Sequence, residues 1–374
     1  MKWKEHSLDD LIHIKHGYAF KGEFFSEEPT DDILLTPGNF AIGGGFKAQK
    51  LKYYNGDFPA DYILDENDII VTMTDLSKEA DTLGFSAKVP AWFGKRFLHN
   101  QRIGLVKLKT DDFDQDYLYW LMRTLSYQRF VANGASGATV KHTSPTKICQ
   151  YKFTAPEDKI TQRKIASILS AYDDLIENNN KRITLLEQKA FLRYKQIVRD
   201  EKMEEQNKLE DFIQTVKRKS KILKSNYKEK GEFPIIDQST DFIGGYTNEK
   251  EAVYEDFPII VFGDHTRILK YITFPFACGA DGTQLVKPEN PNISISYLYF
   301  ELISCNLSNY HYARHFKFLK EQIIKLPNEK VMLEYKEETD NIFNLMHLLR
   351  LKNTKLREAR DILLPRLMNG EIEV

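Results

Sequence analysis

The chain has 374 residues, of which 42% are hydrophobic and 12% aromatic, a composition that excludes a largely disordered protein. Its 53 Lys and Arg residues are balanced by 54 Asp and Glu residues, which argues against a free-standing nucleic-acid-binding protein with a general basic excess. Three widely spaced cysteines without a CxxC pair indicate free thiols in a reducing cytoplasm, and we expect neither a secretory signal nor a membrane span.

Short runs rich in β-branched and aromatic residues, each bounded by Gly, Pro, Asn or Asp, predict strands at residues 68–73 and 103–108. Apolar residues at spacings of three and four then predict a helix at residues 113–132. The same signals return in the same order later in the chain. They predict strands at residues 258–262 and 271–277, followed by a helix at residues 296–316.

A long polar helix is predicted after Pro156 and another after Pro327. Each carries apolar residues at alternating steps of three and four, the pattern of a heptad seam. We expect Pro365 and Gly370 to end the second helix. The first seam holds Ile165, Leu169, Tyr172, Ile176, Asn179, Ile183, Leu186, Ala190 and Ile197, and the second holds Ile342, Leu345, Leu349, Lys352, Leu356, Ala359 and Leu363.

An approximate internal repeat connects these elements, and chance similarity between two α+β segments is the alternative explanation. The matched segments are residues 8–12 with 209–213, 57–59 with 256–258, 105–107 with 285–287, and 117–119 with 297–299. Single helices with one apolar seam are marginal alone in water, so we expect the two long helices to pack against each other. The alternative is that each seam binds a different partner.

The predicted fold class is therefore α+β, with two similar globular domains in tandem, each followed by a long helix, and the two helices paired as an antiparallel coiled coil. The predicted boundaries are residues 1–156 and 207–327 for the globular domains, and residues 157–206 and 328–374 for the helices. Two similar heads held apart by a two-helix spacer would suit a DNA site with two different half-sites separated by unread base pairs.

Polar and basic segments in each globular domain are candidates for DNA contact. A solvated loop or an ordinary helix-terminating turn is the alternative for each of them. Their side chains are of the types that bind phosphates or pair with guanine and adenine. In the first domain they are Asn100, Gln101, Arg102, Ser136, Thr139, Lys141 and His142; in the second they are Lys217, Arg218, Lys219, Lys221, Thr283, Gln284, Arg314, His315 and Lys317.

Signatures of catalysis are absent from the sequence. It contains no adjacent prolines for an amino-methylating motif, no Pro-Asp dipeptide of a common nuclease motif and no GxxxxGK[ST] phosphate loop. His311 and His315 lie four residues apart, but two histidines alone do not make a zinc site. We therefore predict no catalytic residue, no metal and no cofactor bound by this chain.

The stretches at residues 173–180, 182–187 and 355–371 resemble the central and distal helical regions of the specificity subunits of type I restriction–modification systems. The resemblance extends over the whole length, and residues 73–84 look like one class of first target-recognition domain, which adds Ser77 and Lys78 to the DNA-binding candidates. It implies a cytoplasmic, non-catalytic subunit. The implied partners are double-stranded DNA, two methyltransferase subunits with S-adenosylmethionine, and motor–nuclease subunits with ATP and magnesium.

The alternatives are a scaffold that binds no DNA and a DNA-modifying enzyme that acts alone. The scaffold would show no salt-dependent binding to DNA. The enzyme would need a catalytic cluster that the sequence does not display.

Overall fold

The computed structural model describes residues 2–48, 51–77, 80–201, 205–214, 216–279, 282–307 and 314–374. Two compact units are present, one formed by Met1–Leu175 with Lys355–Val374 and the other by Ile176–Thr354. The two long helices are α5 (Lys159–Asp200) and α8 (Glu329–Met368), and each contributes one part to each unit. The domain boundaries predicted from the sequence lie near the ends of these helices. The compact units differ from that division, because the boundary between them falls within both helices.

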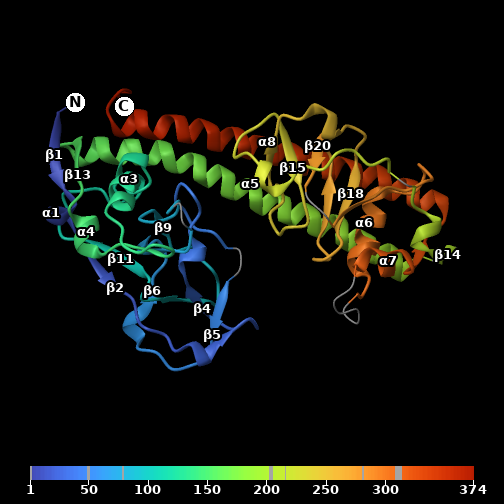
Figure 1. Ribbon diagram of the computed structural model, residues 1–374, viewed down its shortest axis with the longest axis horizontal. Helices are drawn as coiled ribbons and strands as arrows, with labels where there is room; N and C mark the ends of the chain where they lie inside the picture. Colours follow the sequence, from blue (N-terminus) through green and yellow to red (C-terminus); the bar gives the residue numbers. More distant parts are fainter. Residues whose placement is uncertain are drawn as a thin grey trace. The chain divides into compact units, whose positions relative to one another are not determined.

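The globular part of the first unit contains a five-stranded sheet, a four-stranded sheet and two short strand pairs, one of them terminal (Figure 1). Its first strand pairs antiparallel with the last strand before α5. The five-stranded sheet has the order β3-β5-β4-β10-β6 and the four-stranded sheet the order β2-β11-β7-β9. The bounds are β1 (Trp3–Ser7), β2 (Ile12–His16), β3 (Phe25–Ser26), β4 (Asp32–Leu35), β5 (Lys52–Tyr54), β6 (Ile63–Leu64), β7 (Ile69–Thr72), β9 (Ser86–Lys88), β10 (Arg96–His99), β11 (Ile103–Leu108) and β13 (Lys152–Pro156).

The second unit repeats this topology with fewer strands. Its first strand also pairs antiparallel with the last strand before its long helix, and its two sheets have the orders β16-β15-β20-β17 and β19-β18-β21. The bounds are β14 (Glu205–Lys208), β15 (Phe233–Ile236), β16 (Gly245–Thr247), β17 (Val253–Tyr254), β18 (Ile259–Gly263), β19 (Leu269–Ile272), β20 (Phe276–Cys278), β21 (Thr283–Val286) and β22 (Ile323–Leu326).

The strand pairings show which strands are equivalent. β4 runs parallel to β10 as β15 does to β20, and β7 lies between β11 and β9 as β18 lies between β21 and β19. One pair of similar sequences is not equivalent in the fold. Residues 57–59 precede β6, whereas residues 256–258 follow β17, which is the counterpart of β6.

Three predicted elements are each broken into two. Residues 113–132 form α2 (Gln115–Leu121) and α3 (Leu125–Asn133), because the hydroxyl of Thr124 accepts a hydrogen bond from the main-chain N of Tyr127 and caps a new helix. Residues 271–277 divide between β19 and β20 around Pro275, which has no amide hydrogen for a strand ladder. Residues 296–316 contribute to α6 (Ile295–Ser304) and α7 (His315–Lys320), and residues 308–313 lie outside the described structure.

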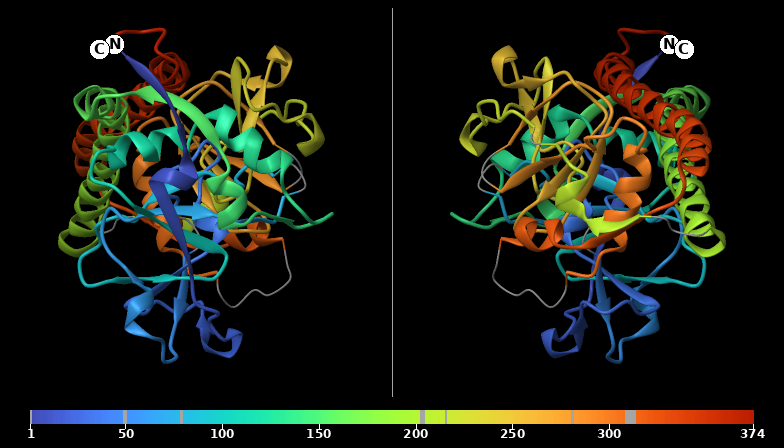
Figure 2. Two further views of the ribbon diagram at one scale, coloured as in Figure 1. Left: turned by 90° about the vertical axis from the view of Figure 1, so that its left-hand side faces the viewer. Right: turned by 90° about the vertical axis from the view of Figure 1, so that its right-hand side faces the viewer.

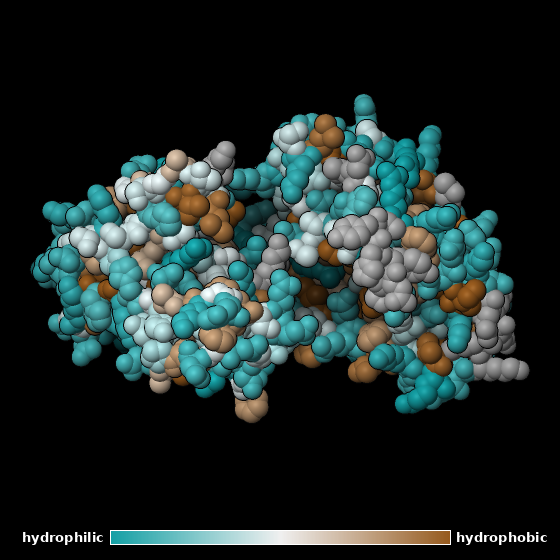
Figure 3. Space-filling model, turned by 60° about the horizontal axis from the view of Figure 1, so that its bottom comes forward, coloured by the Kyte–Doolittle hydropathy of each residue, from teal (hydrophilic) through white to brown (hydrophobic). Residues whose placement is uncertain are grey.

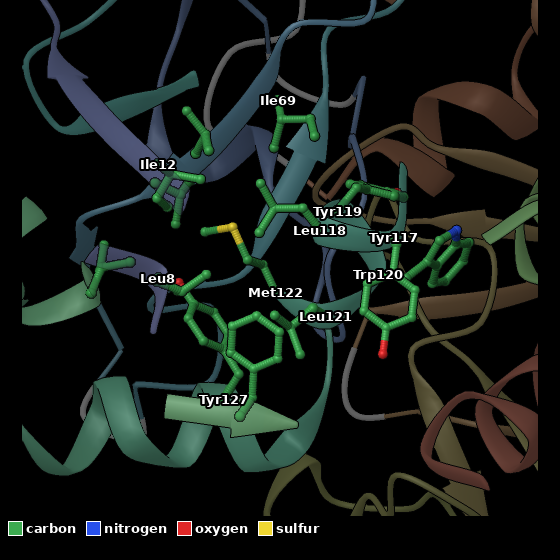
Figure 4. Packing of buried hydrophobic residues seen from close by; sticks show 14 of the residues in the cluster. Leu8, Ile12, Ile69, Tyr117, Leu118, Tyr119, Trp120, Leu121, Met122 and Tyr127 are labelled. Atoms are coloured by element: carbon green, nitrogen blue, oxygen red, sulfur yellow. The ribbon is translucent and has the colours of Figure 1, made fainter. Parts of the chain in front are cut away.

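The core of the first unit forms where α2, α3 and the four-stranded sheet meet (Figure 4). Tyr117, Trp120 and Tyr127 are fully buried beside Ile12 and Ile69. Trp120 also donates a hydrogen bond from Nε1 to Ser170 Oγ on α5, at 2.9 Å. The globular part of this unit is thereby packed onto the first half of α5.

Within each unit α5 and α8 lie side by side and run antiparallel (Figure 1). In the first unit Asp173 contacts Arg360, and in the second unit Asn179 donates from Nδ2 to Asn353 Oδ1 at 2.8 Å. Of the predicted seam residues in α5, Ile165, Leu169, Ile176 and Asn179 are buried and Tyr172, Ile183 and Leu186 are half-buried.

The prediction for the seam of α8 is wrong at two positions. Lys352 and Leu345 are exposed, whereas the adjacent Asn353 and Met346 are buried. The remaining seam positions are buried or half-buried, namely Ile342, Leu349, Leu356, Ala359 and Leu363. The inward-facing residues of α8 form a buried track with steps of four and then three residues. Ile342, Leu349 and Leu356 belong both to this buried track and to the predicted seam.

Pro365 does not end α8, which continues to Met368. The chain leaves the helix at Gly370, whose φ of +74° favours glycine. A side chain there would also collide with Trp3, since its Cβ would lie 2.6 Å from the ring atom Cζ2. Figure 2 shows the two end segments of the chain together.

Candidate nucleic-acid interface

Three separate segments of the first unit meet at the end of β7. The main-chain N of Met73 donates to Arg102 O at 2.9 Å, and the N of Thr143 donates to Met73 O at 3.0 Å. These bonds join residues 73–77, 100–102 and 136–143, which we call the first node. It gathers the candidates Ser77, Gln101, Arg102, Ser136, Thr139, Lys141 and His142 on one part of the unit.

The segment after β7 is held by a buried carboxylate. Asp75 accepts hydrogen bonds from the N atoms of Ser77 and Thr82, both at 2.7 Å, and from Thr82 Oγ1 at 2.6 Å. Burial alone would raise the pKa of Asp75, but these hydrogen bonds outweigh it and hold the pKa below its ordinary value. Ser77 is half-buried and donates from Oγ to Asp81, and Lys78 lies outside the described residues.

The opposite side of the first node is a short ribbon. β12 (Lys141–His142) pairs with β8 (Thr74–Asp75), and His142 Nδ1 lies 3.1 Å from Thr74 Oγ1. Ser136 and His142 exchange main-chain hydrogen bonds of 2.9 Å. Ser136, Thr139 and His142 are exposed and Lys141 is half-buried, so this ribbon presents a hydroxyl-rich surface with two basic groups.

The turn before β11 contains two exposed candidates and one buried residue. Gln101 and Arg102 are exposed, whereas Asn100 is buried and accepts a hydrogen bond from the N of Arg102 at 3.0 Å. Gly17 packs so closely here that a Cβ would lie 2.2 Å from Asn100 O. Asn100 therefore holds the turn, and Gln101 and Arg102 are the candidates there that solvent can reach.

The second unit contains the same arrangement, which we call the second node: residues 264–267, 282–284 and 314–317. The N of Asp264 donates to Gly282 O at 2.7 Å, and the N of His315 donates to Asp264 O at 2.9 Å. The Asp264 carboxylate also accepts from the N of Phe316 at 2.8 Å. Thr283 is buried, Gln284 is half-buried, and Arg314 and Lys317 are exposed.

Sequence reasoning missed one segment of the second node. The turn from Asp264 to Arg267 connects β18 to β19 and was not among the candidates. The signal available was indirect, since two adjacent predicted strands imply a connecting turn. His315 is buried rather than presented to solvent, and Arg267 donates from Nε to His315 Nε2 at 3.3 Å.

A basic cavity of about 290 Å³ adjoins the second node. Arg218, Lys219, Lys221 and Lys320 line it together with Thr283 and Gln284. Arg218 donates from Nη2 to Gln284 Oε1 at 3.2 Å, and the N of Lys219 donates to Tyr254 Oη at 2.8 Å. The structure therefore brings the basic segment predicted from sequence next to the start of β21, while Lys217 is exposed outside the cavity lining.

The chemistry of both nodes is that of recognition. Hydroxyls, amides, guanidiniums and ammonium groups bind phosphates and base edges. Across the described ranges, no three His, Cys, Asp or Glu side chains are grouped to hold a metal ion, and no helix is long and apolar enough to cross a membrane. On the face drawn in Figure 3, hydrophilic side chains predominate among the coloured residues and apolar ones form small separate groups.

Comparison with known proteins agrees with this picture. Residues 1–188, half of the chain, match the family described as type I restriction modification DNA specificity domain. Over 174 residues the chain is 26% identical to the specificity subunit of the Escherichia coli type I restriction enzyme EcoBI, covering 46% of this chain and 33% of that protein. Over 310 residues it is 25% identical to the specificity subunit of the type I restriction enzyme MjaIX from Methanocaldococcus jannaschii, covering 71% and 70%.

The first of these matches spans about one third of the relative's own length. Among solved structures, the S subunit of the type I restriction–modification system from M. genitalium superposes with a TM-score of 0.57 at 16% identity, covering 98% of this chain and 96% of that one. This likeness concerns the fold and includes both units. The chain belongs to the family of type I restriction–modification DNA specificity domains.

Proposed function

We propose that this chain selects the DNA site for a type I restriction–modification complex, and that each unit reads one half of a split, asymmetric site. The observation that carries the proposal is the occurrence of two nodes with the same main-chain hydrogen bonds and different side chains. Equivalent scaffolds would approach DNA in the same manner. Different side chains on them would read different bases.

The side chains of the two nodes and of the basic cavity beside the second node divide into two functional groups. Lys141, Lys219, Lys221 and Lys320 are suited to neutralising phosphates, which gives affinity and salt dependence. Gln101, Arg102 and Gln284 are suited to reading base edges, because amide and guanidinium groups make paired hydrogen bonds with adenine and guanine. The balanced net charge is consistent with partner subunits that also contact the DNA.

We assign the chemistry and its cofactors to those partners. The adenine methyltransferase subunits would carry S-adenosylmethionine, and the motor–nuclease subunits would carry ATP and magnesium. A docking surface for the methyltransferase is available on the helices of the second unit. Leu185 on α5 and Leu348 on α8 have 64% and 60% of their surface exposed, and Leu345, on the preceding turn of α8, is also exposed.

Leu185 and Leu345 lie on the side of the helices that does not contact the globular part of the second unit, and Leu348 lies about 100° around α8 from the contacting His347. The contacting side is marked by Glu187, which accepts from Tyr299, and by His347, which stacks on Phe274. With 100° between successive helix residues, Leu185 and Leu345 lie about 160° around their helices from those contacts. Exposed leucines grouped on a helical surface favour a partner with an apolar helical face.

The function is tested by co-expressing the chain with its methyltransferase and mapping methylated adenines by single-molecule sequencing. A single bipartite asymmetric motif that disappears on deletion of this chain would support the proposal. No motif, or a motif that survives the deletion, would favour the scaffold alternative. Methylation or nicking by the purified chain alone would favour the enzyme alternative.

The docking surface is tested by capture of the methyltransferase on the tagged chain. The double variant Leu185→Asp and Leu348→Asp should lose capture, because two charges would have to be buried in the interface. Ser167→Asp, an exposed polar position of α5 in the first unit, is the matched control and should retain it. Equal capture by both variants would place the methyltransferase elsewhere.

A further inference from the structure

We infer that the turn joining β18 to β19, residues Asp264 to Arg267, reads bases of one half-site, and that the Arg267 guanidinium pairs with a guanine there. This inference rests on the proposed function and deepens it. It assigns a specificity-determining residue in a segment that the sequence did not single out. Three features of the structure carry the argument: the equivalence of two turns, the backbone of Arg267 and the groups that surround it.

The first feature is the topological equivalence of the turn to the segment after β7. β7 pairs with β11 so that Thr72 lies opposite Ile103, and β18 pairs with β21 so that Gly263 lies opposite Thr283. Thr72 is the last residue of β7, and Gly263 is the last residue of β18. The residue that follows is Met73 in the first unit and Asp264 in the second, so both chains leave the sheet at the same point.

The same two main-chain hydrogen bonds then hold both exits. Met73 donates to the residue before β11 and accepts from the segment before α4 (Pro145–Cys149). Asp264 donates to the residue before β21 and accepts from the first residue of α7. If the first node contacts DNA with residues after Met73, the equivalent contact in the second unit comes from the residues after Asp264.

The second feature is the backbone of Arg267, which has a φ of +63°. The turn is closed by hydrogen bonds from the N of Arg267 to Gly263 O at 2.7 Å and from the N of Gly263 to Ile268 O at 2.8 Å. Its last residue must adopt the left-handed conformation, which glycine reaches at no steric cost. An arginine here is unfavourable for the turn, so the side chain is the reason for its presence.

The third feature is the set of groups around Arg267. Its Nε lies 3.3 Å from His315 Nε2, which holds the guanidinium beside α7. Gln284 lies on the other side of Asp264, with Nε2 3.5 Å from Asp264 Oδ2. Arginine recognises guanine O6 and N7 in the major groove, so a turn at the edge of the sheet that carries Arg267, with Gln284 nearby, is suited to this contact.

The test is to map methylated adenines for Arg267→Gly in cells that also express the methyltransferase subunit. Glycine removes the guanidinium and relieves the left-handed backbone, so this variant should fold. We expect one G·C pair in one half-site to become degenerate, with discrimination at that position reduced about 5- to 140-fold, while the other half-site is unchanged. Arg267→Lys, which keeps the charge and loses the planar pair of donors, should relax the same position.

Arg199→Ala is the matched control, because it removes a guanidinium from the exposed end of α5 in the same unit. It should leave both half-sites unchanged. An unaltered motif in Arg267→Gly, or a change in both half-sites, would overturn the assignment of Arg267 while the proposed function stands. The absence of any bipartite motif with the unaltered chain would overturn the proposed function and this inference together.

Discussion

Replacing Asp173 with alanine should destabilise the first unit far more than loss of a surface ion pair would. Asp173 on α5 contacts two guanidinium groups, Arg123 Nη1 at 2.6 Å and Arg360 Nη1 on α8. The Arg123 side chain is only 2% exposed and packs 4.3 Å over the Trp120 ring. Without Asp173, a buried cation would remain without its carboxylate.

Removing one partner of a buried ion pair costs about 3–5 kcal/mol. We expect the lower end, about 3 kcal/mol, for two reasons. The Asp173 side chain is 30% exposed, and Arg123 keeps its hydrogen bonds to Gly43 O at 3.0 Å and Tyr119 Oη at 2.7 Å. In a unit of this size the loss corresponds to a fall in Tm of about 6–12 °C.

Tryptophan fluorescence measures this unit selectively, because Trp3, Trp92 and Trp120 are the only tryptophans of the chain and all lie in it. Thermal unfolding of the Asp173→Ala variant followed in this way should show the predicted shift. Asp174→Ala removes a neighbouring, exposed carboxylate and is the matched control. A loss below about 1 kcal/mol for Asp173→Ala, the range of exposed pairs, would refute the reasoning.

Three further predictions concern acid pH, the seam and the spacing of half-sites. Burial would raise the pKa of Asp173, but the guanidinium groups of Arg123 and Arg360 outweigh it and lower that pKa. The ionised Asp173 therefore stabilises the fold fully above its pKa in the unfolded chain, about 3.9, and this stabilisation is lost as the pH falls through its lower pKa in the folded chain. The difference in Tm between the unaltered chain and Asp173→Ala should therefore shrink below about pH 4. Asn353→Ala should lower the free energy of unfolding by about 1–3 kcal/mol, because it leaves Asn179 buried without its partner. Lys352→Ala removes an exposed side chain and should change it by less than about 0.5 kcal/mol. Equal effects of the two variants in calorimetry would contradict the buried track of α8. Removing seven residues from α5 and the seven residues that pair with them from α8 shortens each helix by about 10 Å. The unread DNA between the half-sites should become about three base pairs shorter, and both half-sites should keep their bases. Altered half-site bases in the methylation map would contradict the spacer role of the helices.

The fold class could be predicted because heptad spacing and short apolar runs are local properties of the sequence. The seam of α8 was misplaced because the predicted seam and the buried track share Ile342, Leu349 and Leu356. Only the packing of the helix decides between the two. Phe343 and Met346 belong to the core of the second unit, which turns the helix so that Asn353 rather than Lys352 faces α5. No local pattern carries that information.

The candidate residues were found by type, and their grouping was not predictable. The hydrogen bonds that gather them join Met73 to Thr143 and Asp264 to His315, residues far apart in the chain, through main-chain atoms that any residue possesses. Arg267 was missed for the same reason. Its φ of +63° and its place in the second node follow from the fold and from no motif.

Main-chain atoms and the buried carboxylates of Asp75 and Asp264 tie the nodes together, so exposed side chains such as those of Gln101 and Arg314 can change without breaking these bonds. If these segments read DNA as proposed, exchanging their exposed residues would alter the specificity and leave the sheet in place. The second unit has a connection of five residues, 264–268, where the first unit has a longer one. We therefore expect new specificities to arise by exchange of short loops, one half-site at a time. The same exchange can be made by design.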